Sequence, residues 1–217
     1  MLYIKKGHEP EALIQAKREG LKHYDDMTTE VKDIVKDSLF TEQGGLCAYC
    51  MRRMQLGTMQ IEHYLPRSIS DEATTIAYSN LLGVCPGNKG NAEKFQTCDA
   101  HRGNKLLTVD PLKPSSVALV RYLSDGTIYS DDADVNRDLQ FTLNLNCAQV
   151  YLPQNRRAAL NSLKQKIHSD CIGQTATKAY FQNLYDALIL GKNGILNEYL
   201  GIMLDYLIKR GAVPTHK

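Results

Sequence analysis

The sequence lacks any apolar run long enough to cross a membrane. No uninterrupted apolar stretch approaches the ~18 residues that a spanning helix needs. Residues 1–7 also lack the long apolar segment that follows the positive charges of a signal peptide. We therefore expect no contact with a membrane and a cytoplasmic location.

The sequence also lacks a strong surplus of positive charge. It has 26 Lys and Arg against 24 Asp and Glu, which gives a formal net charge of +2. Proteins that bind duplex nucleic acid on their own usually carry a basic stripe. The weak charge argues against a stand-alone binder of nucleic acid. It also fits an enzyme whose substrate is gripped partly by a partner subunit.

What the chain does contain is typical of a folded globular protein, with 43% hydrophobic and 23% charged residues. Apolar residues recur mainly at helical spacing, which predicts a mainly α fold. Gly44-Gly45 ends the second predicted helix and turns the chain into Cys47. The predicted helices are 9–20, 28–43 with Thr28 or Thr29 as its cap, 135–145, 154–171, 175–190 and 194–209.

A small α+β unit interrupts the predicted helices. Residues 59–63 and 81–84 read as strands joined by a polar loop, and a short helix is expected near Cys98. Further on, Asp125-Gly126 predicts a hairpin turn between 120–123 and 127–129. The expected organisation is an N-terminal helical segment over 1–45, a finger over 46–107, and a connector with a helical region over 108–217.

The last predicted helix, 194–209, is apolar on most of its sides. A helix of this kind is usually buried in a core. The alternative is that it forms a docking surface for another chain.

Four cysteines frame the finger. Cys47 and Cys50 form a C-x-x-C motif, and Cys85 and Cys98 are a second pair separated by twelve residues. Four thiolates complete a closed tetrahedral site that binds structural zinc, and zinc supplies folding free energy to a unit this small. His101 is a rival fourth ligand. The two remaining cysteines are expected to be reduced, buried, small apolar residues: Cys147 and Cys171.

Inside this frame lies the dipeptide Glu62-His63. Hydrolysis of a phosphodiester needs a base that activates water and a cation that stabilises charge on the phosphoryl group. A histidine has the right pKa range for the base. A carboxylate with one further ligand can hold a single Mg²⁺. Inside the cysteine frame the pair could serve such chemistry, with Glu62 on the cation and His63 as the base; the alternative is an ordinary exposed dipeptide.

Four segments of the finger region carry a family resemblance: 44–50 (GGLCAYC), 61–68 (IEHYLPRS), 78–82 (YSNLL) and 98–105 (CDAHRGNK). They resemble the HNH endonucleases, which have a zinc-stapled ββα-metal finger. More closely, they resemble the PtuB-type HNH proteins of Septu and retron-associated anti-phage systems. The resemblance is most specific over about residues 40–110, and it implies an endonuclease that hydrolyses nucleic acid.

The resemblance also implies roles for single residues. His63 matches the general base, and Glu62 matches the metal ligand that is usually aspartate. Asn80 matches the asparagine that holds the catalytic loop and orients the histidine. The third family position follows the last cysteine, where Asp99 fits the register and His101 fits the residue type. We favour Asp99 as the second ligand of a catalytic Mg²⁺ or Mn²⁺.

Basic residues of the finger are candidate phosphate contacts. Arg102 and Lys105 are expected on the finger helix facing phosphate, and Arg67 and Lys89 could add further contacts. The remaining histidines have no partner pattern, and no functional role is expected for His8, His23, His168 and His216.

The resemblance implies partners as well. PtuB-type nucleases work with a PtuA-like ATPase of the ABC or SMC type, and a retron adds a reverse transcriptase and its RNA/DNA product. The sequence has no G-x-x-x-x-G-K-[ST] motif, so nucleotide control would come from another subunit. DNA is the favoured substrate, with RNA, including tRNA, as an alternative. Two non-catalytic alternatives are a zinc finger that binds nucleic acid or protein, and a zinc-stabilised scaffold.

Overall fold

Helices account for most of the regular structure in residues 1–214, the part of the chain that the computed structural model describes. His216 lies outside this part. The helices are α1 (Glu11–Arg18), α2 (Thr29–Glu42), α3 (Glu72–Thr75), α4 (Cys98–Arg102), α5 (Pro114–Val117), α6 (Ala133–Arg137), α7 (Leu152–Asp170), α8 (Lys178–Leu190) and α9 (Leu200–Ile208). The strands are β1 (Gln60–His63), β2 (Leu81–Val84), β3 (Arg121–Tyr122) and β4 (Ile128–Tyr129).

The N-terminal helices form where their sequence signals lie. The Thr28 hydroxyl accepts a hydrogen bond from the Val31 amide at 3.3 Å and caps α2, as the sequence predicts. Gly44 and Gly45 then adopt φ angles of +60° and +73°, which favour glycine, and they end the helix. The expectation for this helix, including its cap and its end, is confirmed.

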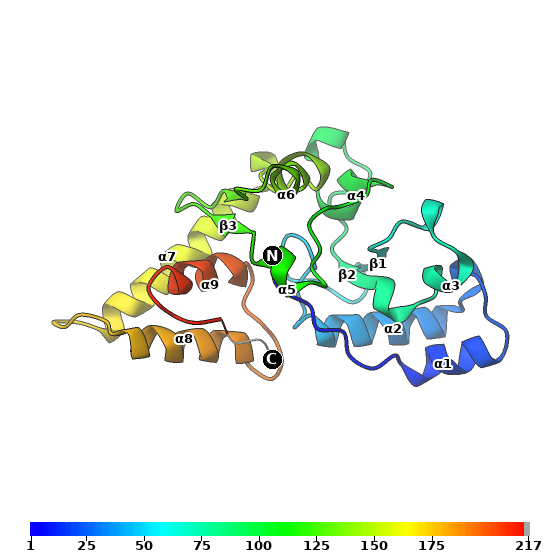
Figure 1. The fold of residues 1–217 in the computed structure, drawn as a ribbon, viewed down its shortest axis with the longest axis horizontal. Helices are drawn as coiled ribbons and strands as arrows, with labels where there is room; N and C mark the ends of the chain where they lie inside the picture. The colour runs from blue at the N-terminus through cyan, green and yellow to red at the C-terminus, as the bar shows by residue number, and fades with distance from the viewer. Residues whose placement is uncertain (215–217) are drawn as a thin grey trace.

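Strands β1 and β2 pair antiparallel, with His63 opposite Leu81 and Gln60 opposite Val84. The Gln43 side chain at the end of α2 ties this ribbon to the helix, because its amide donates to the Gly83 carbonyl and accepts from the Gly83 amide. Helix α4 completes a ββα unit, and Figure 1 shows the strands of this unit beside α2 and α3. A mainly helical fold with a small embedded ββα finger is therefore what the structure contains.

The C-terminal region differs from the prediction at two helices. Helix α6 ends at Arg137, and a π-helical turn, η5 (Asp138–Thr142), replaces the rest of the predicted 135–145 helix. Helix α9 begins at Leu200 and not at 194, because residues 195–199 form a non-helical clasp that hydrogen bonds to Gly44 and Met51 hold in place. The Leu196 amide donates to the Gly44 carbonyl at 3.0 Å, and the Tyr199 amide donates to the Met51 carbonyl at 2.9 Å.

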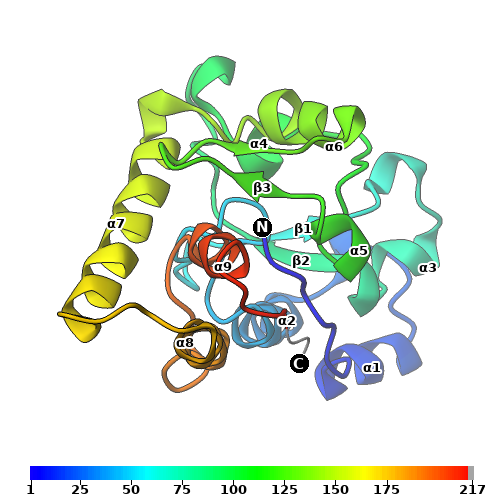
Figure 2. The same cartoon turned by 60° about the vertical axis from the view of Figure 1, so that its left-hand side comes forward.

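Most of α9 is buried on all sides. Seven of its nine residues are buried, and the helix contacts α7, α8 and β3. Figure 2 shows it between α7 and α2, in the middle of the molecule. The core interpretation of this apolar helix is therefore confirmed, while Leu204 and Ile208 line a cavity of about 360 Å³.

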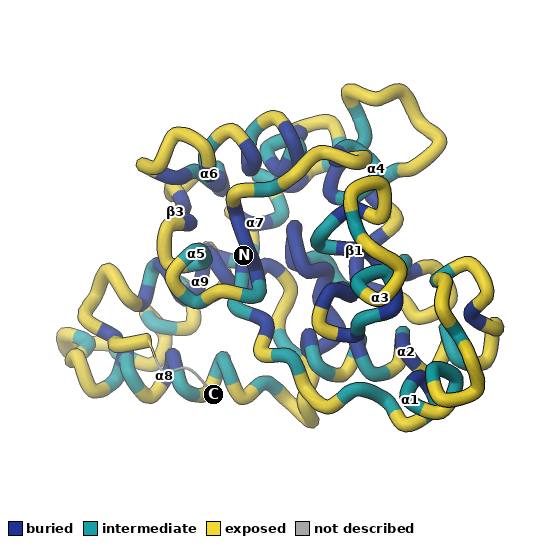
Figure 3. Tube along the Cα trace, turned by 45° about the vertical axis from the view of Figure 1, so that its right-hand side comes forward, coloured by how far each residue is buried: buried dark blue, intermediate teal, exposed yellow. Residues whose placement is uncertain are grey.

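One cluster of buried apolar residues joins the whole described chain. It contains residues from each of the ranges 1–45, 46–107 and 108–217, whose boundaries stay predictions. Figure 3 shows the buried segments gathered where the finger meets the C-terminal helices. Among residues 1–214, none of the helices has both the length and the apolar character that a membrane crossing requires.

Candidate functional site: a cysteine cluster and an acid-histidine pair

The four framing cysteines converge on one point. Cys47 and Cys50 come from the knuckle after α2, Cys85 follows β2 directly, and Cys98 begins α4. Their sulfur atoms all lie within 4.8 Å of one another, and all four residues are buried. The His101 ring is not part of this group, because its Nδ1 lies 3.1 Å from the Thr142 carbonyl oxygen. The ligand atoms that converge are therefore those of the four cysteines, without His101.

The spacing of the sulfurs fits a tetrahedral ion. The sulfur atoms are separated by 3.9 Å for Cys47 and Cys98, 3.7 Å for Cys50 and Cys85, and 3.8 Å for Cys85 and Cys98. Four thiolates around zinc, at about 2.3 Å each, stand about 3.8 Å apart. Disulfides need sulfur separations of about 2.05 Å, so these thiols are free. The donor set and its spacing both suit a closed structural metal site.

The two remaining cysteines are also free. Cys147 is buried, as expected, and its thiol lies 3.5 Å from the Lys94 carbonyl oxygen. Cys171 is half-exposed, so the expectation that it is buried is wrong. It follows the last residue of α7, where the chain leaves the core.

Arg102 occupies the centre of the finger and not its surface. It is 1% exposed and forms an ion pair with Glu62. Its guanidinium also donates to the Tyr49 hydroxyl at 3.0 Å and to the carbonyls of His63 and Tyr64. The expectation that Arg102 faces a substrate phosphate is therefore corrected. Its Nε also donates to the Lys105 carbonyl at 2.8 Å, so all three nitrogens of the planar guanidinium have acceptors inside the finger.

Glu62 and Asp99 form an acidic pair in the same finger as the cysteine cluster. Burial, together with the adjacent Asp99 carboxylate, raises the pKa of Glu62 to about 8, although Arg102 opposes this shift. Glu62 also accepts a hydrogen bond from the Tyr49 hydroxyl at 2.9 Å. Asp99 is half-exposed on α4. Two carboxyl groups in contact near a surface disfavour joint ionisation, and a bound cation would relieve that repulsion.

His63 is the last residue of β1, and a hydrogen bond to the loop between the strands orients its ring. Its Nε2 lies 2.9 Å from the Thr75 carbonyl oxygen, which can only accept, so Nε2 carries the hydrogen. In the neutral ring this leaves the lone pair on Nδ1. Burial lowers the pKa of His63, the Arg67 charge adds to this effect, and the Thr75 hydrogen bond opposes it. The ring is therefore neutral at neutral pH and is able to accept a proton.

Asn80 closes the loop between the two strands. Its side-chain amide donates to the carbonyls of Leu65 and Thr74, at 3.1 and 3.2 Å, and its oxygen accepts from the Leu65 amide at 2.7 Å. These bonds hold the segment whose Thr75 carbonyl fixes the His63 ring. Asn80 thus lies where the resemblance expects a residue that holds the loop.

The other predicted phosphate contacts lie on the surface. Lys89 is exposed in the loop after Cys85, and Lys105 is exposed after α4. Arg67 is exposed too, but its guanidinium pairs with Asp25 at 2.6 Å.

Sequence reasoning missed the partner segment that reaches this site, the 3₁₀ turn η1 (Tyr24–Asp26). The Tyr24 ring meets the His63 ring edge to face, with centroids 4.6 Å apart. No local sequence pattern predicts this contact, because it joins residues 39 positions apart and depends on how α1 and α2 pack. The His23 imidazole also approaches Glu72 at 3.7 Å.

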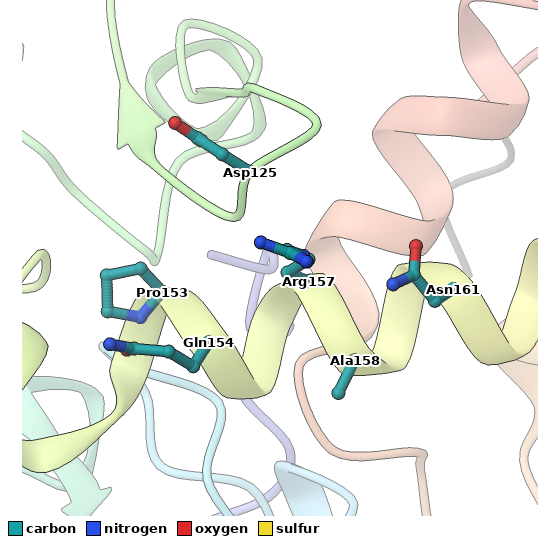
Figure 4. A pocket seen from close by; sticks show the side chains of 6 residues that line it. All are labelled: Asp125, Pro153, Gln154, Arg157, Ala158 and Asn161. Atoms are coloured by element: carbon teal, nitrogen blue, oxygen red, sulfur yellow. The ribbon is translucent and has the colours of Figure 1, made fainter.

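A surface depression of about 560 Å³ lies away from this site. It is formed on α7 beside the β3–β4 turn (Figure 4). Its lining contains no residue of the finger and no cluster of metal-ligating groups. The lining residues are Asp125, Pro153, Gln154, Arg157, Ala158 and Asn161.

Comparison with known proteins supports an HNH relationship for part of the chain. A protein of Vibrio cholerae serotype O1 biovar El Tor carries the provisional name of an HNH endonuclease of retron Vc95, and it is 34% identical to this chain over 100 residues. The match covers 45% of this chain and 47% of the relative, so it spans about half of each protein. No family model matches the chain.

Proposed function

We propose that this protein is a metal-dependent HNH endonuclease that hydrolyses phosphodiester bonds, with DNA as its substrate. One observation carries the proposal: a neutral, oriented histidine, His63, stands beside the acidic pair Glu62 and Asp99 in a finger stapled by four cysteines. The provisional name of the Vibrio relative supports the same chemistry.

In this proposal, Nδ1 of His63 takes a proton from the attacking water, while the Thr75 carbonyl holds the ring through Nε2. Asn80 keeps the loop that presents this carbonyl. A Mg²⁺ or Mn²⁺ ion held by Asp99 and Glu62 would supply positive charge to the phosphoryl oxygens. The contact between Asp99 and Glu62 supports Asp99 over His101 as the second ligand, since the His101 ring is turned to Thr142.

The test is a cleavage assay on DNA and RNA of the same sequence with added Mg²⁺, together with neighbouring gene products where these are required for activity. We expect the wild-type protein to cut DNA, and the His63→Ala variant to lose at least about 100-fold in rate, because it lacks the proton acceptor. Zinc content and thermal unfolding should match the wild type. Undiminished cutting by His63→Ala would overturn the assignment of the base.

We further propose that the nuclease is the effector of a PtuB-type anti-phage assembly. The retron in the name of the Vibrio relative supports this proposal. The partners would be a PtuA-like ATPase and a retron reverse transcriptase with its RNA/DNA product. Affinity purification of the tagged chain, expressed with its neighbouring genes, should recover an ATPase in stoichiometric amount. Recovery of the chain alone, from cells in which those genes are expressed, would contradict the proposal.

A further inference from the structure

The Tyr24 ring, which lies outside the finger, is in contact with three side chains: His63, Lys32 and Arg67. The Tyr24 ring packs edge to face against His63, and two cations lie over or beside it. The Lys32 ammonium is 5.2 Å from the ring centroid, and the Arg67 guanidinium carbon is 5.4 Å from it. Both distances fall within the ~6 Å range of cation–π attraction. Tyr24 therefore gathers two positive charges beside the proposed general base.

The segments that meet here are far apart in the sequence. Tyr24 lies in η1 and Lys32 in the first turns of α2, whereas His63 and Arg67 belong to the finger. Burial raises the pKa of Tyr24, which therefore stays a neutral phenol. The ring can hold both cations without neutralising either of them.

One anion already occupies this cluster. The Asp25 carboxylate pairs with Arg67 at 2.6 Å, and Asp25 is largely exposed. Like Arg67, the Lys32 charge acts on the Asp25 carboxylate and lowers its pKa. Water and salt screen an exposed ion pair of this kind, so it is weak and a stronger anion can replace the carboxylate. The Asp25 oxygen marks a position where a phosphate oxygen would be bound by the Arg67 guanidinium.

We propose that Tyr24, Lys32 and Arg67 form a phosphate-binding subsite beside His63, which grips the nucleic-acid backbone next to the bond that is cut, and that Asp25 holds Arg67 until a phosphate replaces it. The inference rests on the proposed nucleic-acid substrate. It assigns a substrate contact to the N-terminal helical segment, so the finger over 46–107 is only part of the site.

Binding of a fluorescein-labelled DNA duplex, and of RNA of the same sequence, tests this subsite in buffer without added divalent cation. We expect Lys32→Gln and Arg67→Gln each to weaken binding and to reduce the slope of log K against log salt by about one, because each removes one phosphate contact. Asp25→Asn should tighten binding, since it releases Arg67. The double variant Asp25→Asn/Arg67→Gln should lose this gain.

Matched controls come from the exposed Lys166–Asp170 pair of α7, whose charged atoms are 2.8 Å apart and which lies far from the finger in Figure 1. Lys166→Gln and Asp170→Asn change the net charge by the same amounts, and we expect them to leave the salt slope unchanged. If the control variants change binding and the salt slope as much as the subsite variants do, the effect comes from the net charge of the protein, and the proposed subsite is wrong. Unchanged binding by both Lys32→Gln and Arg67→Gln would overturn it as well.

The role of the ring has its own comparison. Tyr24→Phe keeps the aromatic face and should bind as the wild type does, while Tyr24→Leu should bind as weakly as Lys32→Gln. Equal binding by the Phe and Leu variants would remove Tyr24 from the subsite. If the binding pattern holds and the wild-type protein never cuts nucleic acid, the proposed nuclease function fails while the phosphate subsite stands.

Discussion

The Cys47→Ser variant is expected to lose its bound metal and to unfold the finger. The four thiols are buried, and their spacing suits a tetrahedral ion. Apparent binding free energies of structural zinc in small fingers reach about 10–16 kcal/mol, which is as large as the whole stability of an ordinary domain, about 5–15 kcal/mol. A serine hydroxyl is a poor substitute for a thiolate, so most of this contribution should disappear.

The measurement combines metal analysis with thermal unfolding followed by circular dichroism. We expect about one tightly bound zinc in the wild-type protein, none in Cys47→Ser, and a much lower melting temperature for the variant. Cys171→Ser is the matched control, because Cys171 is free and half-exposed. It should retain both the zinc and the melting temperature. Purified wild-type protein without bound metal would contradict the assignment.

Removal of the Arg102 side chain is expected to have the second largest effect. Arg102→Ala leaves the buried Glu62 carboxyl without its cationic partner, and it leaves the carbonyls of His63 and Tyr64 without a donor. A buried carbonyl left without a donor costs about 1–3 kcal/mol, so the two together cost about 2–6 kcal/mol. Urea unfolding should therefore show a loss of this size, and cleavage should fall with the folded fraction.

Arg137→Ala provides the comparison. Its guanidinium pairs with Asp134 at 2.7 Å, but both side chains are more than half exposed. Exposed pairs of this kind contribute about 0–1 kcal/mol, so this variant should unfold almost as the wild type does. Similar small losses for the two variants would show that Arg102 is not the structural centre of the finger.

Local signals predicted those parts of the fold whose cause is local. The cap at Thr28, the glycines after α2 and the Asp125-Gly126 turn each determine the backbone of their own neighbourhood. Strands β1 and β2 were predictable as well, because short apolar runs flank the loop that joins them. Spacing also identified the four cysteines, since metal chemistry restricts which side chains can converge.

The parts that were missed depend on contacts between distant segments. Leu196 lies outside the last helix because its backbone groups bond to Gly44 and Arg53 and not to other helical residues. The helical spacing of the sequence contains no information about these two distant partners. Tyr24 reaches His63 only through the packing of the N-terminal helices. Arg102 did carry a local signal: it lies three residues after Asp99, and so on the same face of α4 that meets Glu62.

The clasp over residues 195–199 also bears on the order in which the chain folds. Arg53 bonds to Leu196 and Glu198 across separations of 143 and 145 residues. During synthesis the knuckle therefore leaves the ribosome long before its clasp exists, and contacts of such long range form late and slowly. All four thiols of the proposed zinc site lie within residues 47–98, so metal uptake there can precede closure of the clasp. Release of the C-terminal helices from the ribosome then becomes the step that adds the clasp to the finger.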